Sequence, residues 1–368
     1  MLSQACQAGA TSRQSEIQED QFQCRSGGKM DSCQEGSEVM TDIADIRFKV
    51  KQLRKMYVPN ERDAEIRLHL LRCLDVDDVG ELLPAPARYS GNEARGVMVI
   101  EGSGGGKTTA IKSVLSEMDI LALNPETGEP RYLALDVPPY ATLKSVGAAI
   151  LEASGMSGVS DKATAAVVWR AVRHRLALLG ITVLWLDEAQ DLVLGDSALE
   201  TEKTLRMLKS LMKGDHPVVP ILSGTERLGE VIGYDPQVSR RFTKIRPSDL
   251  EFGADEGSIL GLIDAYCAEV GLRADLGNDL AARLIHASRR RFGRAVVFIL
   301  HAIESALMDG EENLTIDHFA VAWVKEESRD PEGNVFLVSD WLSVELDQEA
   351  EEYEEGRSRR QKKKLERA

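Results

Sequence analysis

The segment whose residues most clearly suggest chemistry is a glycine-rich stretch, EGSGGGKTT, over residues 101–109. Glycines let the backbone curl until its N–H groups surround a bound anion, and a following helix adds its positive end. Lys107 is expected to reach the β- and γ-phosphates of ATP, and the Thr108 hydroxyl is expected to ligate Mg²⁺. The predicted nucleotide-binding residues are Gly102, Ser103, Gly104, Gly105, Gly106, Lys107, Thr108 and Thr109.

The first residue of this loop departs from the usual pattern. Glu101 stands where a phosphate-binding loop normally has its first glycine, and Gly102 comes one position late. A carboxylate near phosphates repels them, so the effect of Glu101 on binding and turnover stays open. The alternative interpretation is a glycine-rich turn that ends in Lys-Thr and binds nothing.

An apolar strand that ends in two carboxylates follows later in the chain, as VLWLDE over 183–188. Asp187 is expected to hold Mg²⁺, partly through water, because this ion prefers oxygen ligands. Glu188 is expected to polarise the water that attacks the γ-phosphate. Such a strand is common by itself, but after a phosphate-binding loop it predicts the second half of an ATP site.

Polar and basic residues at two later positions are candidates for sensing the γ-phosphate. Ser223 and Thr225 follow the fourth predicted strand, where a polar side chain can contact the γ-phosphate or the attacking water. The alternative is that they only form a turn. Arg240 and Arg241 precede Phe242, and an arginine there could reach the γ-phosphate of a neighbouring subunit and stabilise the transition state. The alternative is a surface arginine pair beside acidic groups.

A second basic run, RRRFGR over 289–294, opens a helix near the end of the chain. Arg294 is expected to fold back over the bound nucleotide. Arg289, Arg290 and Arg291 are candidates for a patch that binds DNA phosphates, or for a solvated basic face.

The elements that position these residues alternate between strands and helices. Strands are predicted at 97–100, 132–137, 181–186, 218–222 and 243–245, with helices at 40–56, 64–74, 108–118, 142–153, 162–179 and 199–213. This alternation indicates a parallel α/β sheet. Only helices are expected afterwards, at 258–270, 276–288, 295–308 and 316–325.

The predicted organisation has five parts. They are a disordered arm (1–40), N-terminal helices (41–90), a nucleotide-binding α/β subdomain (91–250), a helical lid subdomain (251–330) and a C-terminal segment (331–368). The last part carries seven acidic residues over 345–355 and seven basic residues over 357–367. Such a run is expected to be a solvated tail or a segment that contacts DNA or a partner.

Composition limits the remaining possibilities. The 368 residues include 45 Lys+Arg and 60 Asp+Glu, so the net charge is −15, and any DNA contact must come from a local basic face. No apolar run is long enough to span a membrane and no secretory signal is recognisable, which predicts a cytoplasmic protein. Five cysteines without CxxC spacing argue against a zinc site or a disulfide framework.

The segments EGSGGGKTT, LALDVPP, LWLDEAQDL, ILSGTERL and SRRF together resemble the TniB group of transposition ATPases. These are AAA+ proteins related to the target-selecting ATPases of Tn7-like and Mu-like elements. The resemblance covers about residues 45–310, and LDVPP is its most specific stretch. It implies a P-loop AAA+ module, in which a parallel five-stranded sheet flanked by helices precedes a small all-helical lid.

The resemblance also implies a function. Such a protein forms an ATP-bound homo-oligomer, a helical filament or a ring, on duplex DNA, and it recruits and stimulates a DDE-type transposase. By position Lys107, Thr108, Asp187 and Glu188 match the ATP motifs, and Arg241 best matches an arginine finger that acts on a neighbouring subunit. Lys107, Glu188 and Arg241 are the expected catalytic residues, with ATP and Mg²⁺ as cofactors.

Two other functions stay open at this point. A replication-initiator or helicase-loader ATPase would use the same nucleotide site, although origin-binding members usually carry an added winged-helix module. A nucleotide-controlled interaction switch without DNA binding would use the charged tails for docking.

Overall fold

The computed structural model describes residues 43–89, 92–139, 141–193, 198–277, 279–327 and 333–346. The predicted N-terminal arm and nearly all of the acidic and basic C-terminal run lie outside these residues.

A parallel sheet forms the centre of the α/β part, and this confirms the predicted fold. Its strand order is β4-β5-β6-β3-β7, and every neighbouring pair is parallel. The strands are β3 (Gly96–Ile100), β4 (Tyr132–Asp136), β5 (Val183–Asp187), β6 (Val219–Gly224) and β7 (Phe242–Ile245). β3, β5 and β6 are buried at every position, as expected for apolar strands covered on both faces.

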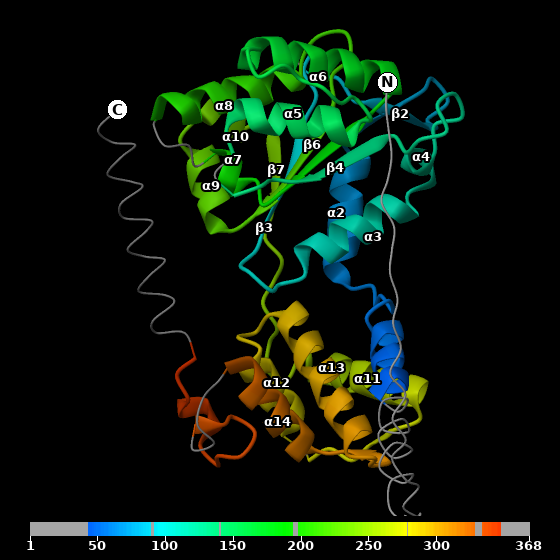
Figure 1. The fold of residues 1–368 in the computed structure, drawn as a ribbon, viewed down its shortest axis with the longest axis vertical. Helices are drawn as coiled ribbons and strands as arrows, with labels where there is room; N and C mark the ends of the chain where they lie inside the picture. The colour runs from blue at the N-terminus through cyan, green and yellow to red at the C-terminus, as the bar shows by residue number, and fades with distance from the viewer. Residues whose placement is uncertain are drawn as a thin grey trace, which may run out of the picture. The chain divides into compact units, whose positions relative to one another are not determined.

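Each face of the sheet has its own apolar core because successive strand residues point to opposite sides. Val97 and Val99 pack on one face with α2 (Glu61–Leu71) and α3 (Lys107–Glu117). Met98 and Ile100 pack on the other face. This face is covered by α5 (Leu143–Ala153), α6 (Ala165–Leu179), α8 (Ala198–Leu211) and α9 (Glu226–Gly233) (Figure 1).

The sheet order brings the predicted chemistry to one edge. β6 pairs with both β5 and β3, so the carboxyl ends of these three strands adjoin. The phosphate-binding loop follows β3, and Asp187 ends β5. In parallel α/β sheets this is the edge at which ligands bind.

The helical part packs around a third apolar core. Its helices are α11 (Glu256–Val270), α12 (Leu280–Ala287), α13 (Phe292–Met308) and α14 (Ile316–Glu327). An N-terminal helix over 43–53 contributes Leu53 to this core, and the segment 333–346 contributes Val335 and Phe336. Two short parallel strands, β8 (Arg273–Ala274) and β9 (Asn313–Leu314), join its loops.

Several elements differ from the expectations. An antiparallel hairpin of β1 (Leu74–Val76) and β2 (Leu82–Pro86) occupies a region without a predicted strand, because the prolines of LLPAP hide the strand pattern. Three short helices were also not predicted, namely α4 (Asp119–Ala122), α7 (Gln190–Val193) and α10 (Pro236–Ser239). The longer helix α9 was not predicted either. None of the described helices has the length and apolar character needed to cross a membrane.

Candidate nucleotide site

The loop between β3 and α3 has the geometry of an anion cradle. Gly104 and Gly106 have φ values of 77° and 103°, in the left-handed region where glycine is favoured. Gly106 is also the N-cap of α3, and no side chain caps this helix end. The N-cap residue therefore supplies no acceptor to the first N–H groups of α3, and the Lys107 N–H contacts the Glu101 carboxylate instead. An anion suits N–H groups at such a helix start.

Asp187 is held at the strand end by a chain of hydrogen bonds. The Thr108 hydroxyl donates to Asp187 Oδ2 (2.6 Å), and the Ser223 hydroxyl donates to Oδ1 (2.6 Å). Trp185 Nε1 in turn donates to Ser223 Oγ (2.7 Å). The hydroxyl of Thr108 and the carboxylate of Asp187 thus meet at one point, and both are oxygen donors that suit Mg²⁺.

This network changes the role expected for Ser223. The prediction placed Ser223 against the γ-phosphate or the attacking water, but its side chain is fully buried and is bonded to Trp185 and Asp187. Ser223 is therefore placed to orient Asp187. Thr225 lies at the strand tip, where its buried hydroxyl has no hydrogen-bond partner among the described residues.

Glu188 is the neighbouring carboxylate, and its backbone is strained. Its φ is 49°, a conformation that non-glycine residues adopt rarely and often at functional sites. One carboxylate oxygen lies 3.2 Å from Lys107 Nζ, and the other accepts a hydrogen bond from Gln190 Nε2 (2.5 Å). Gln190 Oε1 also accepts from the Thr225 backbone N–H (3.3 Å), so Gln190 links the catalytic candidate to the tip of β6.

The unusual Glu101 has a partner that sequence reasoning missed. Arg62, on α2, lies 3.2 Å from Glu101 Oε1 and donates to the Gly105 carbonyl (2.8 Å). Their side chains are 8% and 13% exposed. Burial raises the pKa of Glu101, and the positive charge of Arg62 opposes this effect. The carboxylate is thereby tied to α2, and it also contacts the Lys107 backbone N–H and packs against Gly105 inside the glycine-rich loop.

The helical part contacts the phosphate-binding loop through three residues. Arg291 donates to the Ser103 carbonyl (2.7 Å), and the Gly293 N–H donates to the Gly105 carbonyl (3.1 Å). A Cβ at Gly293 would lie 2.5 Å from the Gly104 carbonyl oxygen, so only glycine fits. Arg294 packs beside the loop near Gly104 and pairs with Glu327 (3.0 Å).

The three arginines of the predicted DNA-binding patch at 289–291 make contacts within their own chain. Arg289 makes two hydrogen bonds to Glu327 (2.7 and 2.8 Å) and another to the Leu346 carbonyl. Arg291 faces the phosphate-binding loop, and Arg290 Nε donates to the Leu250 carbonyl. Arg289 and Arg290 have φ values of 55° and 59°, so the backbone turns sharply and their side chains diverge. All three line one cleft, in which acidic side chains accompany them.

Arg241, the expected arginine finger, is engaged within its own chain. Its side chain is 6% exposed and donates to Glu93 from Nε (2.7 Å) and Nη2 (2.6 Å) and to the Gln237 carbonyl. Arg241 and Lys213 lower the pKa of Glu93 to about 2. Arg240, in contrast, is exposed at the end of α10.

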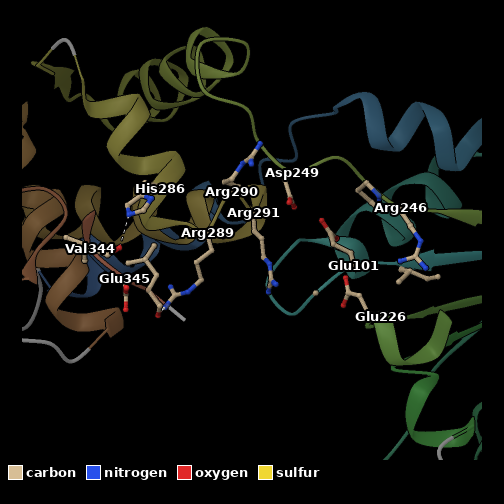
Figure 2. A pocket seen from close by; sticks show the side chains of 14 residues that line it. Glu101, Glu226, Arg246, Asp249, His286, Arg289, Arg290, Arg291, Val344 and Glu345 are labelled. Carbon is tan, nitrogen blue, oxygen red and sulfur yellow. Dashed lines mark hydrogen bonds between the residues drawn. The ribbon is translucent and has the colours of Figure 1, made fainter. Parts of the chain in front are cut away.

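A polar cleft of about 790 Å³ adjoins the loop (Figure 2). Its lining combines acidic and basic side chains, namely Glu101, Glu226, Arg246, Asp249, His286, Arg289, Arg290, Arg291 and Glu345. The cleft includes Gly102 but not Lys107, Asp187 or Glu188. It therefore lies beside the phosphate position and not at the reacting groups.

The structure thus gathers Lys107, Thr108, Asp187 and Glu188 at one sheet edge, and it adds Arg62, Gln190 and Glu327, which were not predicted. The acidic residue inside the glycine loop is a signal that a basic partner is needed. Nothing in the local pattern identifies Arg62 as that partner, because it lies on a separate helix.

Comparisons with known proteins agree with this geometry. Residues 76–251 match the family model of the bacterial TniB protein, so the predicted resemblance is confirmed and this region is TniB-like. No curated protein matches the chain.

Solved structures show the same AAA+ fold at low sequence identity. The Aeropyrum pernix ORC1 protein, solved in complex with DNA, is 19% identical with a TM-score of 0.52, over 73% of this chain and 66% of that one. The Aeropyrum pernix ORC2 protein, in ADPNP–ADP complexes, is 18% identical (TM-score 0.50, 75% and 71%). Cdc6p from Pyrobaculum aerophilum is 13% identical (TM-score 0.51, 72% and 68%). The chain therefore spans just under two thirds of the ORC1 protein.

Proposed function

From the TniB-like match over 76–251, we propose that this AAA+ protein hydrolyses ATP, assembles on duplex DNA in its ATP-bound form, and recruits or activates a DDE-type transposase. The observation that carries the proposal is the convergence of Lys107, Thr108, Asp187 and Glu188 at the carboxyl edge of the sheet. This arrangement matches the needs of phosphoryl transfer, which relies on positioning and charge stabilisation.

The residues divide the chemistry between them. Thr108 and Asp187 would hold Mg²⁺, which neutralises charge that develops on the phosphates. In the structure Lys107 pairs with Glu188, and the same ammonium group is the one expected to bind the β- and γ-phosphates. When Lys107 shifts to the phosphates, Glu188 Oε1 becomes available to polarise the attacking water. Glu188 Oε2 keeps its bond to Gln190, which holds the carboxylate in place.

The arginine that completes the site from a neighbouring subunit is Arg240 in this proposal. Arg241 is committed to Glu93 inside its own chain, whereas Arg240 lies exposed one position earlier. A guanidinium supplied by another subunit makes hydrolysis depend on assembly, because it stabilises charge only when the subunits are in contact.

The DNA and transposase parts of the proposal rest on the family resemblance. A structural relative of this fold, the ORC1 protein, was solved in complex with DNA, which is compatible with that part. The net charge of −15 requires that contact with DNA be local.

The proposal is tested by the anisotropy of a labelled duplex titrated with protein and either a non-hydrolysable ATP analogue or ADP. We expect tight binding with the analogue and much weaker binding with ADP, and we expect the DNA-bound form to retain a co-expressed transposase. Equal binding in both nucleotide states would remove the ATP control. Retention of a replicative helicase instead would favour the helicase-loader alternative, and no DNA binding at low salt would favour the switch.

A further inference from the structure

The N-terminal helix carries a concentration of positive charge that the nucleotide site does not use. Residues 46–60 include five basic residues and no acidic one, in a chain whose net charge is −15. The helix over 43–53 ends in a hydrogen-bonded turn, in which the N–H groups of Arg54 and Lys55 donate to the Val50 and Gln52 carbonyls. The basic residues therefore lie on a defined helical scaffold.

Packing fixes which side of this helix faces outward. Val50 and Leu53 are buried, and Leu53 joins the apolar core formed by α11–α14. One flank of the helix, beside this buried stripe, exposes Arg47, Lys51, Arg54 and Lys55, which we call the basic face. Arg47, Lys51 and Arg54 follow at steps of four and three residues, so they line up along the helix axis.

The side chains of the basic face remain available for an external partner. Across the described ranges no hydrogen bond or ion pair engages the side chain of any of these four residues. The arginines at 289–291, in contrast, are directed to Glu327, Leu250 and the phosphate-binding loop. The N-terminal helix thus offers positive side chains free of the intrachain contacts that the arginines at 289–291 make.

We propose that the basic face binds the phosphate backbone of duplex DNA, an inference that rests on the proposed function and gives it a location. Arg47 and Arg54 are separated by seven residues, or about 10 Å along the helix. That distance corresponds to roughly three base pairs of duplex at 3.4 Å each, so several phosphates lie within reach of the face.

A membrane surface fits this helix less well. An interfacial helix inserts a broad apolar stripe into the lipid. Here Leu53 and Met56 are used in packing on α11–α14, and within 46–55 the only large apolar side chain that is exposed is Phe48. One phenylalanine beside four basic residues suits contact with a nucleic acid groove better than lipid insertion.

The test compares two variants with equal changes of charge. One replaces the basic face (Arg47→Gln, Lys51→Gln, Arg54→Gln, Lys55→Gln). The matched control replaces four exposed basic residues of the α/β part (Lys162→Gln, Arg170→Gln, Arg173→Gln, Lys203→Gln). Affinity for a labelled duplex is measured with the ATP analogue over a range of salt concentrations, beside ATP affinity and the urea midpoint of each protein.

The expected change follows from counterion release. Each phosphate contact contributes about 0.9 to the slope of log affinity against log salt, so losing four contacts lowers the slope by about 3.6 per protomer. Between about 50 and 200 mM salt, wild type should lose about 150-fold more affinity than the basic-face variant. The control variant should keep the wild-type slope, and both variants should keep ATP affinity. If the quadruple variant proves unstable, the double variant Lys51→Gln with Arg54→Gln should lower the salt slope by half as much.

Three outcomes would overturn the inference that the basic face binds duplex DNA. A wild-type slope in the basic-face variant would place the contact elsewhere. Equal loss in the control variant would show an effect of overall charge only. Binding to vesicles with anionic lipid, but not to duplex, would assign the face to a membrane. If wild type binds no duplex in either nucleotide state, the proposed function itself fails.

Discussion

Replacing Arg62 by Met should destabilise the protein strongly, because it leaves the buried carboxylate of Glu101 without its partner. The charged atoms lie 3.2 Å apart, and the two side chains are only 8% and 13% exposed. At an effective dielectric constant of about 20, the attraction at this distance is about 5 kcal/mol. After desolvation is considered, removal of one partner from such a pair costs about 3–5 kcal/mol. Loss of the bond to the Gly105 carbonyl contributes to the same cost.

The double variant separates this explanation from a simple packing defect. Arg62→Met with Glu101→Gln has no stranded charge, so it should be more stable than Arg62→Met alone by about 2 kcal/mol. Free energies of unfolding in urea for wild type, both single variants and the double variant give the coupling directly. If the two substitutions destabilise additively, Glu101 does not depend on Arg62 and the reasoning is refuted.

The pH dependence provides a second check on the same pair. Burial raises the pKa of Glu101 above its ordinary value of 4.5, and removal of Arg62 should raise it further. When the pKa of a carboxyl group is higher in the folded state than in the unfolded state, the folded protein loses stability as pH increases from the unfolded-state pKa through the folded-state pKa. The deficit of Arg62→Met should therefore be smaller at about pH 5 than at about pH 7.5. Glu101→Gln in the same background should remove this dependence, and a deficit that is constant with pH would contradict it.

The other predictions concern hydrolysis and the Glu93 pair. Lys107→Ala should abolish binding of a fluorescent ATP analogue, and Glu188→Gln should bind it but lose about 10²-fold or more of turnover; normal turnover in either variant would contradict the assigned roles. Arg240→Ala should keep the urea midpoint but lose hydrolysis that depends on protein concentration. Arg241→Ala should instead lower stability by about 2 kcal/mol because it removes one of the two basic partners of Glu93 and leaves Lys213, and the reverse pattern would restore Arg241 as the finger. Since the pKa of Glu93 is lowered to about 2, wild type should lose stability as pH falls from 4.5 toward 2, and Glu93→Gln should flatten that profile.

The sheet and the reacting residues were predictable because each has a local signature. Apolar runs such as 183–186 predict a strand buried on both faces, and the structure has β5 there. The glycine-rich loop requires a strand before it and a helix after it, which fixes the place of Lys107 and Thr108. Since Asp187 ends a second buried strand of the same parallel sheet, its position at the same edge was also predictable from the sequence.

The roles that changed depend on contacts between distant parts of the chain. Arg241 is fixed by Glu93, Glu101 by Arg62, and Arg289 by Glu327, and no local pattern identifies these partners. Consecutive arginines suggested one basic face because the sequence does not show the left-handed turn at Arg289 and Arg290. Short-range periodicity reports the solvent-facing side of a helix, but it does not report which charges meet in three dimensions.

The proposed function requires that ATP drive assembly of this protein on duplex DNA. Electron microscopy of the purified protein with duplex tests this assembly, by comparing a non-hydrolysable ATP analogue with ADP. We expect filaments or rings on DNA with the analogue and dispersed protein with ADP. Dispersed protein in both states, from a sample that binds the analogue normally, would contradict it.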